Sequence, residues 1–205
     1  MPESFLALAE LSETIHPLTD LVLEMAMAQL HEWRRAGITS SISVNLSARN
    51  LIDDRCLLTI RNLMQEYQIG PGALEVEITE TALMHDPAQA AERLDWIAAL
   101  GVRISIDDYG TGYSSLGYLH RLPINALKID RLFVTDMRTG VHDAIIVRST
   151  IALAHSLGLI VVAESVEDGA TQEMLEGMGC DQIQGYHLSM PLPAEKLGQF
   201  VAVAA

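Results

Sequence analysis

Cysteine is scarce in this sequence, since Cys56 and Cys180 are the only two among 205 residues. They lie far apart and in none of the spacings that bind zinc, which argues against a cysteine metal site and against a disulfide framework. Reduced thiols are the simpler interpretation, and a cytoplasmic location is expected.

Positive charge is also scarce. Lysine and arginine total 13 against 27 aspartates and glutamates, so the formal net charge is −14. A protein that holds a nucleic-acid polymer by its phosphates needs a basic face, and this composition argues against one. A small anionic ligand stays compatible with the charge if metal ions lie between the protein and the phosphate.

Long apolar runs are missing as well. No run approaches the roughly 20 residues that span a bilayer, and residues 1–5 contain neither a basic region nor the start of a signal peptide. No membrane segment is therefore expected. Linkers, repeats and low-complexity tracts are also absent, so residues 1–205 are expected to form a single domain.

Two hydrophobic periodicities alternate along the chain. Helical spacing of three and four residues relates Leu23, Met27, Leu30 and Trp33. Short runs rich in Val and Ile predict six strands, at residues 42–44, 74–78, 102–106, 127–129, 159–163 and 182–183.

Capping residues mark the helix ends. Asp86 followed by Pro87 supplies an N-cap and a proline at the first helical position. Glycines follow helical stretches at positions 37, 101, 158 and 179, where a left-handed C-cap is wanted. The sequence therefore predicts strands that alternate with helices.

Buried strands separated by helix-length segments predict a parallel α/β architecture. Two arrangements are open at this point, a doubly wound open sheet and a closed TIM-like (β/α)8 barrel. No glycine-rich phosphate loop follows the first strand, which weighs against a nucleotide-binding open sheet. Six strands are too few for the barrel, so either two are missing or the sheet is open.

Polar residues stand at the C-terminal ends of these strands, which converge on one face in parallel β/α folds. Carboxylates and amide oxygens gathered there would suit Mg²⁺ or Mn²⁺, and paired cations can activate water against a phosphodiester. The residues are Asn45, Glu77, Glu80, Asp107, Asp108, Lys128, Asp130, Glu164 and Gln184.

Two of these features have a simpler interpretation beside the functional one. Lys128 either provides a fixed positive charge for a phosphate or the nucleophile, or forms an ordinary buried ion pair. The glycine- and serine-rich run from Tyr109 to Ser115 either shapes the site or is a simple turn.

Six segments resemble the EAL domain family of cyclic-di-GMP phosphodiesterases, in family order and over nearly the whole chain. They are Val44-Asn45-Leu46-Ser47, Glu77-Ile78-Thr79-Glu80, Asp107-Asp108-Tyr109-Gly110-Thr111-Gly112-Tyr113-Ser114-Ser115, Leu127-Lys128-Ile129-Asp130-Arg131, Val162-Ala163-Glu164-Ser165-Val166-Glu167 and Gln184-Gly185-Tyr186.

The resemblance implies a barrel enzyme that opens cyclic-di-GMP to linear pGpG with two Mg²⁺ or Mn²⁺ ions. The metal ligands that it implies, direct or through water, are Asn45, Glu77, Asp107, Asp108, Glu164 and Gln184, with Asp107 bridging. Its catalytic set is Asp107, Lys128, Glu164 and Glu80, and Glu80 would brace the loop of Tyr109, Gly110, Thr111 and Gly112. Glu167 would support the site from behind, and Asn45, Lys128, Gln184, Gly185 and Tyr186 would contact substrate.

The family also implies partners. A homodimer is expected, often formed through elements near that loop, together with sensory or diguanylate-cyclase-like domains in a longer chain. A strand with the Glu-Ala/Val-Leu motif, its metal-binding glutamate and a nearby arginine is expected just before residue 1, with an earlier strand. Without these strands the barrel would have two unpaired strand edges, which favour aggregation. The chain is therefore expected to be a fragment or a mis-started reading of a longer protein, or to close the gap by dimerising.

Four positions depart from the family pattern. Leu188 and Met190 stand where an aromatic and a basic residue are usual, which affects guanine stacking and a phosphate contact. Tyr109 replaces phenylalanine and Ser165 replaces glycine, which are expected to be mild changes.

Three functions stay open from the sequence. The intact carboxylate set favours a metal-dependent cyclic-di-GMP phosphodiesterase. The missing glutamate favours a catalytically inactive cyclic-di-GMP receptor or protein-interaction module. A different metal-using barrel enzyme is the third, and the order of the motifs argues against it.

Overall fold

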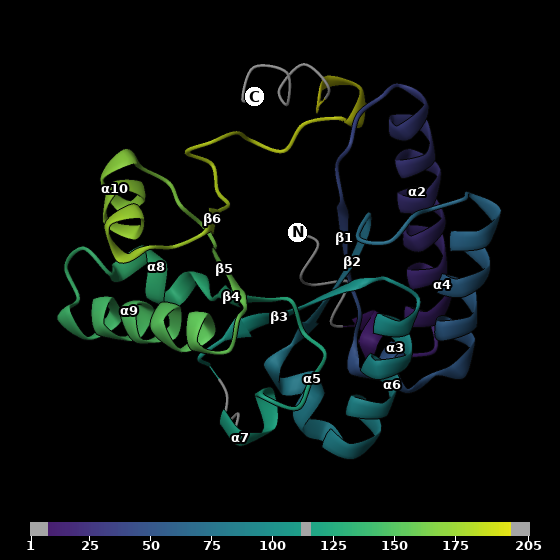
Figure 1. Ribbon diagram of the computed structural model, residues 1–205, viewed down its shortest axis with the longest axis horizontal. Helices are drawn as coiled ribbons and strands as arrows, with labels where there is room; N and C mark the ends of the chain where they lie inside the picture. The colour runs from purple at the N-terminus through teal and green to yellow at the C-terminus, as the bar shows by residue number, and fades with distance from the viewer. Residues whose placement is uncertain (1–7, 112–115, 198–205) are drawn as a thin grey trace. The chain divides into compact units, whose positions relative to one another are not determined.

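The computed structural model describes residues 8–111 and 116–197 and divides into two compact units. The first unit contains the described residues of 1–105 and 114–124, and the second those of 106–113 and 125–205. Figure 1 labels the elements of both. The expectation that residues 1–205 form a single domain stays a prediction.

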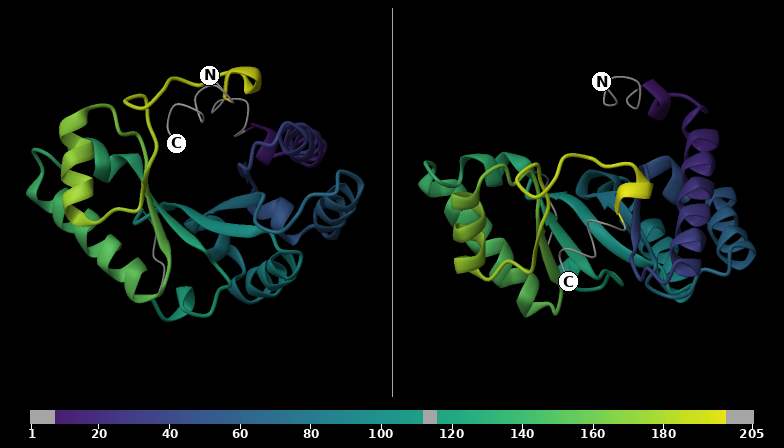
Figure 2. Two further views of the ribbon diagram at one scale, coloured as in Figure 1. Left: turned by 45° about the horizontal axis from the view of Figure 1, so that its top comes forward. Right: turned by 90° about the horizontal axis from the view of Figure 1, so that it is seen from above.

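The first unit is mostly helical. Its elements are α2 (Ile15–Arg35), β1 (Ile42–Asn45), α3 (Ala48–Ile52), α4 (Asp54–Glu66), β2 (Leu74–Thr79), α5 (Glu80–His85), α6 (Pro87–Ala99), the start of β3 (Arg103–Tyr109) and α7 (Leu116–Leu119). Helix α2 packs on β1 and α4, and lies beside α4 in both views of Figure 2. Its buried stripe includes Leu23, Met27, Leu30 and Trp33, as the spacing predicts.

The second unit contains the rest of β3 and the later elements. These are β4 (Ala126–Ile129), α8 (Arg131–Asp136), α9 (Val141–Ser156), β5 (Ile160–Ala163), α10 (Gly169–Met178) and β6 (Gln182–Ile183). Helix α9 packs on β4, β5 and α8. None of the described helices combines the length and the apolar character needed to cross a membrane.

The six strands described follow one another in sequential order, from β1 to β6. The pairs β1–β2, β4–β5 and β5–β6 are parallel. Parallel neighbours need a crossover, and the intervening helices provide it. The predicted strands and the parallel α/β architecture are thus confirmed.

Alternation along the strands separates the core from the polar residues. In β2, Leu74, Val76 and Ile78 are completely buried, and Glu75 and Glu77 occupy the alternate positions. In β3, Ile104 and Ile106 alternate with Ser105 and Asp107. Side chains of a strand point to opposite faces in turn, so aliphatic residues pack on one face and polar residues lie on the other.

The capping predictions are also confirmed. The Asp86 side chain accepts a hydrogen bond from the backbone N–H of Gln89, with Pro87 at the start of α6. Gly37, Gly101, Gly158 and Gly179 all have positive φ, between 74° and 82°. These left-handed residues end four helices just before a strand begins.

The third strand extends further than its apolar run of residues 102–106 indicates. It continues through Asp107 and Asp108 to Tyr109. The change of direction occurs inside the strand, because Asp108 has a φ of 53°.

Candidate functional site

The first unit brings two of the predicted ligands together at the ends of β1 and β2. Asn45 and Glu77 are directly paired in the parallel register. Asn45 is exposed, whereas Glu77 is 8 % exposed. Neighbouring positions of paired parallel strands lie about 5 Å apart, so one ligand could contact both side chains.

Glu80 follows at the start of α5 and is almost completely buried, with 2 % of its surface exposed. The hydroxyl of Thr79 caps this helix by accepting from the N–H of Ala82, at 3.3 Å. A carboxylate at a helix N-terminus is stabilised by the helix dipole. Its bracing of the loop after the aspartate pair stays a prediction.

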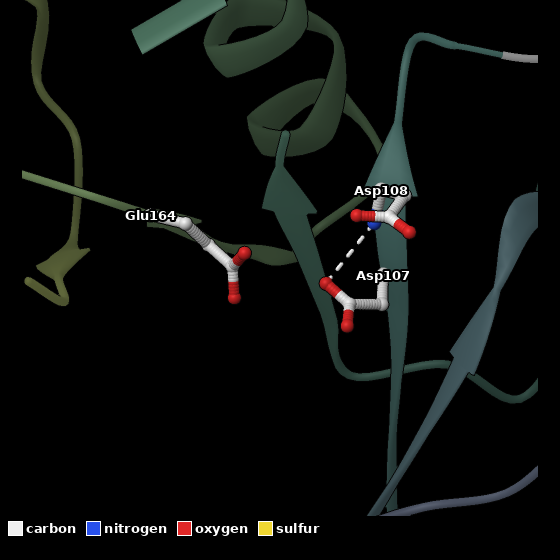
Figure 3. A group of neighbouring side chains, drawn as sticks. All are labelled: Asp107, Asp108 and Glu164. Carbon is white, nitrogen blue, oxygen red and sulfur yellow. Dashed lines mark hydrogen bonds between the residues drawn. The ribbon is translucent and has the colours of Figure 1, made fainter. Parts of the chain in front are cut away.

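The second unit brings three of the predicted ligands together. Oxygen atoms of Asp107, Asp108 and Glu164 all lie within 4.8 Å of one another, and all three residues are half-buried. Figure 3 shows the carboxyl group of Glu164, just after β5, directed toward Asp107 on β3, and β4 lies between these two strands in the sheet. This group is called the acidic cluster below.

The backbone of Asp108 explains how consecutive residues reach one cluster. Successive side chains of a regular strand point to opposite faces. The φ of 53° at Asp108 breaks that alternation, and its N–H donates to Asp107 Oδ1 at 3.0 Å (Figure 3). A left-handed conformation is unfavourable for a residue with a Cβ, so this geometry stores strain at the site.

Lys128 is the cation of the acidic cluster. Its Nζ lies 2.7 Å from Glu164 Oε1 and 3.4 Å from Asp107 Oδ1, and 5 % of its side chain is exposed. The structure shows the buried ion pair, and a role of Lys128 toward a phosphate or the nucleophile stays a prediction. A single lysine does not balance three carboxylates, so the acidic cluster keeps excess negative charge.

Burial and the neighbouring carboxylates change the acidity of Asp108. Burial raises the pKa of Asp108 to about 6, helped by a hydrogen bond with Asp130 and by the charges of Asp107, Asp130 and Glu164. Asp130 is 8 % exposed and also caps α8 by accepting from the N–H of Leu132 at 2.6 Å. The carboxylates thus repel one another in the absence of further positive charge.

The donor set fits a hard divalent cation. Carboxylate oxygens are the ligands that Mg²⁺ and Mn²⁺ prefer. A cation placed among them would relieve the repulsion that, after burial, contributes to the raised pKa of Asp108. Asp107, Asp108 and Glu164 would hold it. Among the described residues, these three form the one group of acidic, histidine or cysteine side chains that lie close enough together to hold a metal ion.

The loop after the acidic cluster begins with a tight turn. Gly110 has a φ of 103°, and a Cβ at this position would lie 2.9 Å from Phe133 Cε2. The Thr111 hydroxyl donates to the carbonyl of Asp108 at 2.9 Å, and Tyr109 is buried. The positive φ and the closeness of Phe133 favour glycine at position 110. The Thr111 hydrogen bond and the burial of Tyr109 fix the start of the loop. Gly112, Tyr113, Ser114 and Ser115 lie outside the described residues.

The segment after Glu164 contains a second strained residue. Ser165 has a φ of 55°, which explains physically why glycine is usual there in the family it resembles. Only three described residues other than glycine have a positive φ, and two of them, Asp108 and Ser165, belong to or adjoin the acidic cluster.

The Gln184-Gly185-Tyr186 segment is placed by backbone pairing. Gln184 accepts from the N–H of Val166 and donates to the carbonyl of Ala163, at 3.0 and 2.8 Å. A Cβ at Gly185 would lie 2.1 Å from Val166 O, so only glycine fits. Register places Gln184 beside Glu164, one residue beyond the Ala163–Ile183 pair.

The remaining predicted residues are exposed. Tyr186, Leu188 and Met190 are 61 %, 45 % and 60 % exposed, and Glu167 is also exposed. Their proposed roles toward substrate or in support of the site stay predictions.

Two features were not predicted from the sequence. Asp130 was named among the polar residues at the strand ends but not in the ligand set implied by the resemblance, and its hydrogen bond helps to raise the pKa of Asp108. The sequence signal that could have indicated this contact is the position of Asp130 two residues after Lys128, at the end of the same strand. The strained backbone of Asp108 and Ser165 has no signal in the residue types themselves, except for the glycine that Ser165 replaces.

Comparison with known proteins identifies the family. The model of the EAL domain matches residues 1–191. The bifunctional diguanylate cyclase/cyclic di-GMP phosphodiesterase MucR of Pseudomonas aeruginosa is 42 % identical over 98 % of this chain and 30 % of its own length. The signaling protein YkoW of Bacillus subtilis is 38 % identical over 98 % of this chain and 25 % of its own length. The chain thus spans between a quarter and a third of these relatives.

Solved structures agree with the sequence comparison. The MucR phosphodiesterase in complex with c-di-GMP has a TM-score of 0.93 and 41 % identity, over 96 % of this chain and 80 % of that one. The EAL domain of Mycobacterium smegmatis DcpA has a TM-score of 0.85 and 35 % identity, over 91 % and 84 %. The likeness confirms the predicted barrel-type β/α fold of the EAL class, and this chain belongs to the EAL domain family.

Proposed function

We propose that this chain hydrolyses cyclic-di-GMP to linear pGpG with the help of two divalent cations, Mg²⁺ or Mn²⁺. The acidic cluster around Lys128 carries this proposal, because it combines three cation ligands with a fixed positive charge. Family membership and the c-di-GMP complex of a structure that is 41 % identical support the choice of substrate.

Asp107, Asp108 and Glu164 are proposed as metal ligands in the second unit. By the family resemblance, Asn45 and Glu77 of the first unit and Gln184 complete the set. Bound there, the cations supply Lewis-acid activation of water and stabilisation of the departing oxygen.

The reaction adds water across one P–O3′ bond of the cyclic dinucleotide. That bond breaks, one new end keeps a 5′-phosphate and the other gains a 3′-hydroxyl, which is the product pGpG. Lys128 is positioned to counter negative charge on the phosphate, because two carboxylates hold its ammonium group in place.

The exposed Tyr186 segment is proposed to contact the nucleotide. Leu188 and Met190 supply neither the aromatic ring nor the positive charge usual in the family, so contacts there are proposed to be apolar. The homodimer, the cytoplasmic location and the sensory or diguanylate-cyclase-like neighbours remain proposals from the resemblance.

The test is chromatographic detection of pGpG after the chain is incubated with cyclic-di-GMP and Mn²⁺. Product is expected with Mn²⁺ and not with EDTA. The Asp107→Asn variant is expected to form no pGpG. The control is Asp136→Asn, which makes the same change of charge at an exposed position of α8 and is expected to leave pGpG formation unchanged. Equal product from the parent and from Asp107→Asn would overturn the proposal. Binding of cyclic-di-GMP without product would instead indicate a receptor.

A further inference from the structure

A polar cavity lies at the N-terminal ends of the strands in the first unit. It has a volume of about 430 Å³ and is lined by residues just before β1 and β2 and by Arg103, the first residue of β3. Asn45 and Glu77 stand at the C-terminal ends of β1 and β2, whereas this cavity lies at the N-terminal ends. It is therefore separate from those two residues.

The charge of the cavity is unusual for this chain. Arg34 and Arg103 both line it, and none of the described residues that line it is acidic, although acidic residues outnumber basic ones by 27 to 13. Three consecutive residues with hydroxyl groups, Thr39, Ser40 and Ser41, complete its polar wall. Arginines and hydroxyl groups are the donors with which proteins recognise phosphate.

The backbone of the 68–70 loop positions Arg34. The Nη1 of Arg34 donates to the carbonyl of Gln68, and a Cβ at Gly70 would lie 3.6 Å from the same Arg34 nitrogen. Gln68 has a φ of 55°, which is an unfavourable conformation for a residue with a Cβ. The contact with Gln68 uses one of the five N–H groups of a guanidinium, so most of its donors remain for another acceptor.

Arg103 is partly satisfied and partly not. Its Nη2 lies 2.7 Å from Glu75 Oε2 and 3.2 Å from Ser41 Oγ. Its Nε is buried and has no hydrogen-bond partner among the described residues. A buried donor without an acceptor costs free energy, but a nitrogen without exposed surface is not reached from the cavity. The Arg103 side chain is 38 % exposed, so an anion would contact the exposed part of that side chain. Glu75 neutralises one of the two arginine charges, so Arg34 and Arg103 together still give the cavity a net charge of one positive unit.

We infer that this cavity binds a phosphate dianion, either inorganic phosphate or the phosphate group of a mononucleotide. Arg34, Arg103 and the 39–41 hydroxyls would hold the oxygens, and the volume leaves room for a group attached to the phosphate. This inference does not depend on the hydrolysis of cyclic-di-GMP, because it rests on different residues.

The test is isothermal titration calorimetry of the whole chain in EDTA, with inorganic phosphate, GMP and guanosine as separate ligands. EDTA keeps divalent cations from recruiting phosphates to the acidic cluster. Arg34→Gln is expected to weaken phosphate or GMP binding at least about tenfold, since hydrogen bonds to charged groups are worth that much. Arg35→Gln removes the same charge from the neighbouring exposed position of α2, outside the cavity, and is expected to change binding less than about twofold.

Each outcome decides for or against the cavity. Binding of phosphate and GMP that Arg34→Gln weakens supports it with the phosphate group as the recognised part. Binding of GMP alone supports it with a nucleotide as the source. No binding of either, equal binding of guanosine and GMP, or equal effects of Arg34→Gln and Arg35→Gln would overturn it. If Arg34→Gln does not fold, Ser41→Ala replaces it, and unchanged binding by that exposed variant would also count against the site.

Discussion

The two units of the molecule present their polar strand ends in different ways. In the first unit, Asn45 is exposed and Glu77 is buried beside it in the register of β1 and β2. In the second, three carboxylates crowd around a lysine, and their mutual repulsion helps to raise the pKa of Asp108 to about 6. Excess charge and strained backbone thus coincide in the second unit.

The difference indicates where a cation contributes most. Crowded carboxylates gain more from a bound cation than separate ones do, because the cation removes repulsion as well as forming bonds. The acidic cluster is therefore expected to supply most of the affinity for the first ion. The residues of the first unit are expected to matter for catalysis more than for initial binding.

The largest effect is expected from Glu164→Gln. Loss of a metal ligand should lower kcat/KM for cyclic-di-GMP by about three orders of magnitude or more. Glu167→Gln makes the same change three residues later at an exposed position and should lower it by less than about tenfold. Steady-state kinetics with pGpG quantified by chromatography provides the measurement.

Glu77→Gln in the same assay sharpens the comparison between the units. A loss as large as that of Glu164→Gln would show that both units serve the reaction. Parent activity in Glu77→Gln would confine the chemistry to the second unit and contradict the assignment of Glu77.

Lys128→Met tests the electrostatics of the acidic cluster. The substitution leaves Asp107 and Glu164 without their cation and should destabilise the fold by about 3–5 kcal/mol in EDTA at pH 7. Arg103→Met in the first unit should cost less, because the Arg103 side chain is 38 % exposed. Chemical denaturation measures both.

Mn²⁺ should partly restore the stability of Lys128→Met, since a divalent cation replaces the lost charge. A destabilisation by Arg103→Met equal to that by Lys128→Met would contradict the contrast between the units. So would a Lys128→Met variant whose stability Mn²⁺ does not raise.

Affinity for Mn²⁺ should depend on pH through Asp108. Its pKa is raised to about 6, so its contribution to the stability of the metal-free fold is present at low pH and is lost as the pH rises through 6. The ion needs the deprotonated carboxylate, and affinity should therefore rise about tenfold between about pH 5 and about pH 7 from this group alone. Calorimetric titrations at the two pH values measure it. Asp108→Asn should weaken binding and flatten the dependence, and an equally steep dependence in that variant would contradict the assignment.

The smallest expected effect concerns backbone strain. Ser165→Gly and Gln68→Gly both place glycine at a positive φ and should each stabilise the fold by about 0.5–1 kcal/mol. Ala152→Gly, an exposed position inside α9, is the control and should destabilise by about 1 kcal/mol. Thermal unfolding distinguishes these signs. Loss of stability in Ser165→Gly would show that the strain is offset by contacts of the serine side chain.

The fold was predictable because its signals are local. Apolar runs such as 74–78, glycines such as Gly179 and the Asp86-Pro87 pair each determine a strand or a helix end by themselves. Parallel pairing then follows from the helices between the strands. The extent of β3 was not predictable, since it depends on how Asp108 bends the backbone.

The acidic cluster was predictable for a similar reason. Asp107, Asp108 and Glu164 follow apolar strands, and the register of parallel strands brings such ends together. The raised pKa of Asp108 was not predictable, because it depends on burial and on the proximity of Asp130, which no spacing in the sequence specifies.

The most direct test of the central claim is anomalous diffraction from crystals grown with Mn²⁺. A Mn²⁺ peak within ligand distance, about 2.2 Å, of oxygens from Asp107, Asp108 and Glu164 is the predicted result. No peak at the acidic cluster, with Lys128 still paired to Glu164 as it is here, would contradict the account.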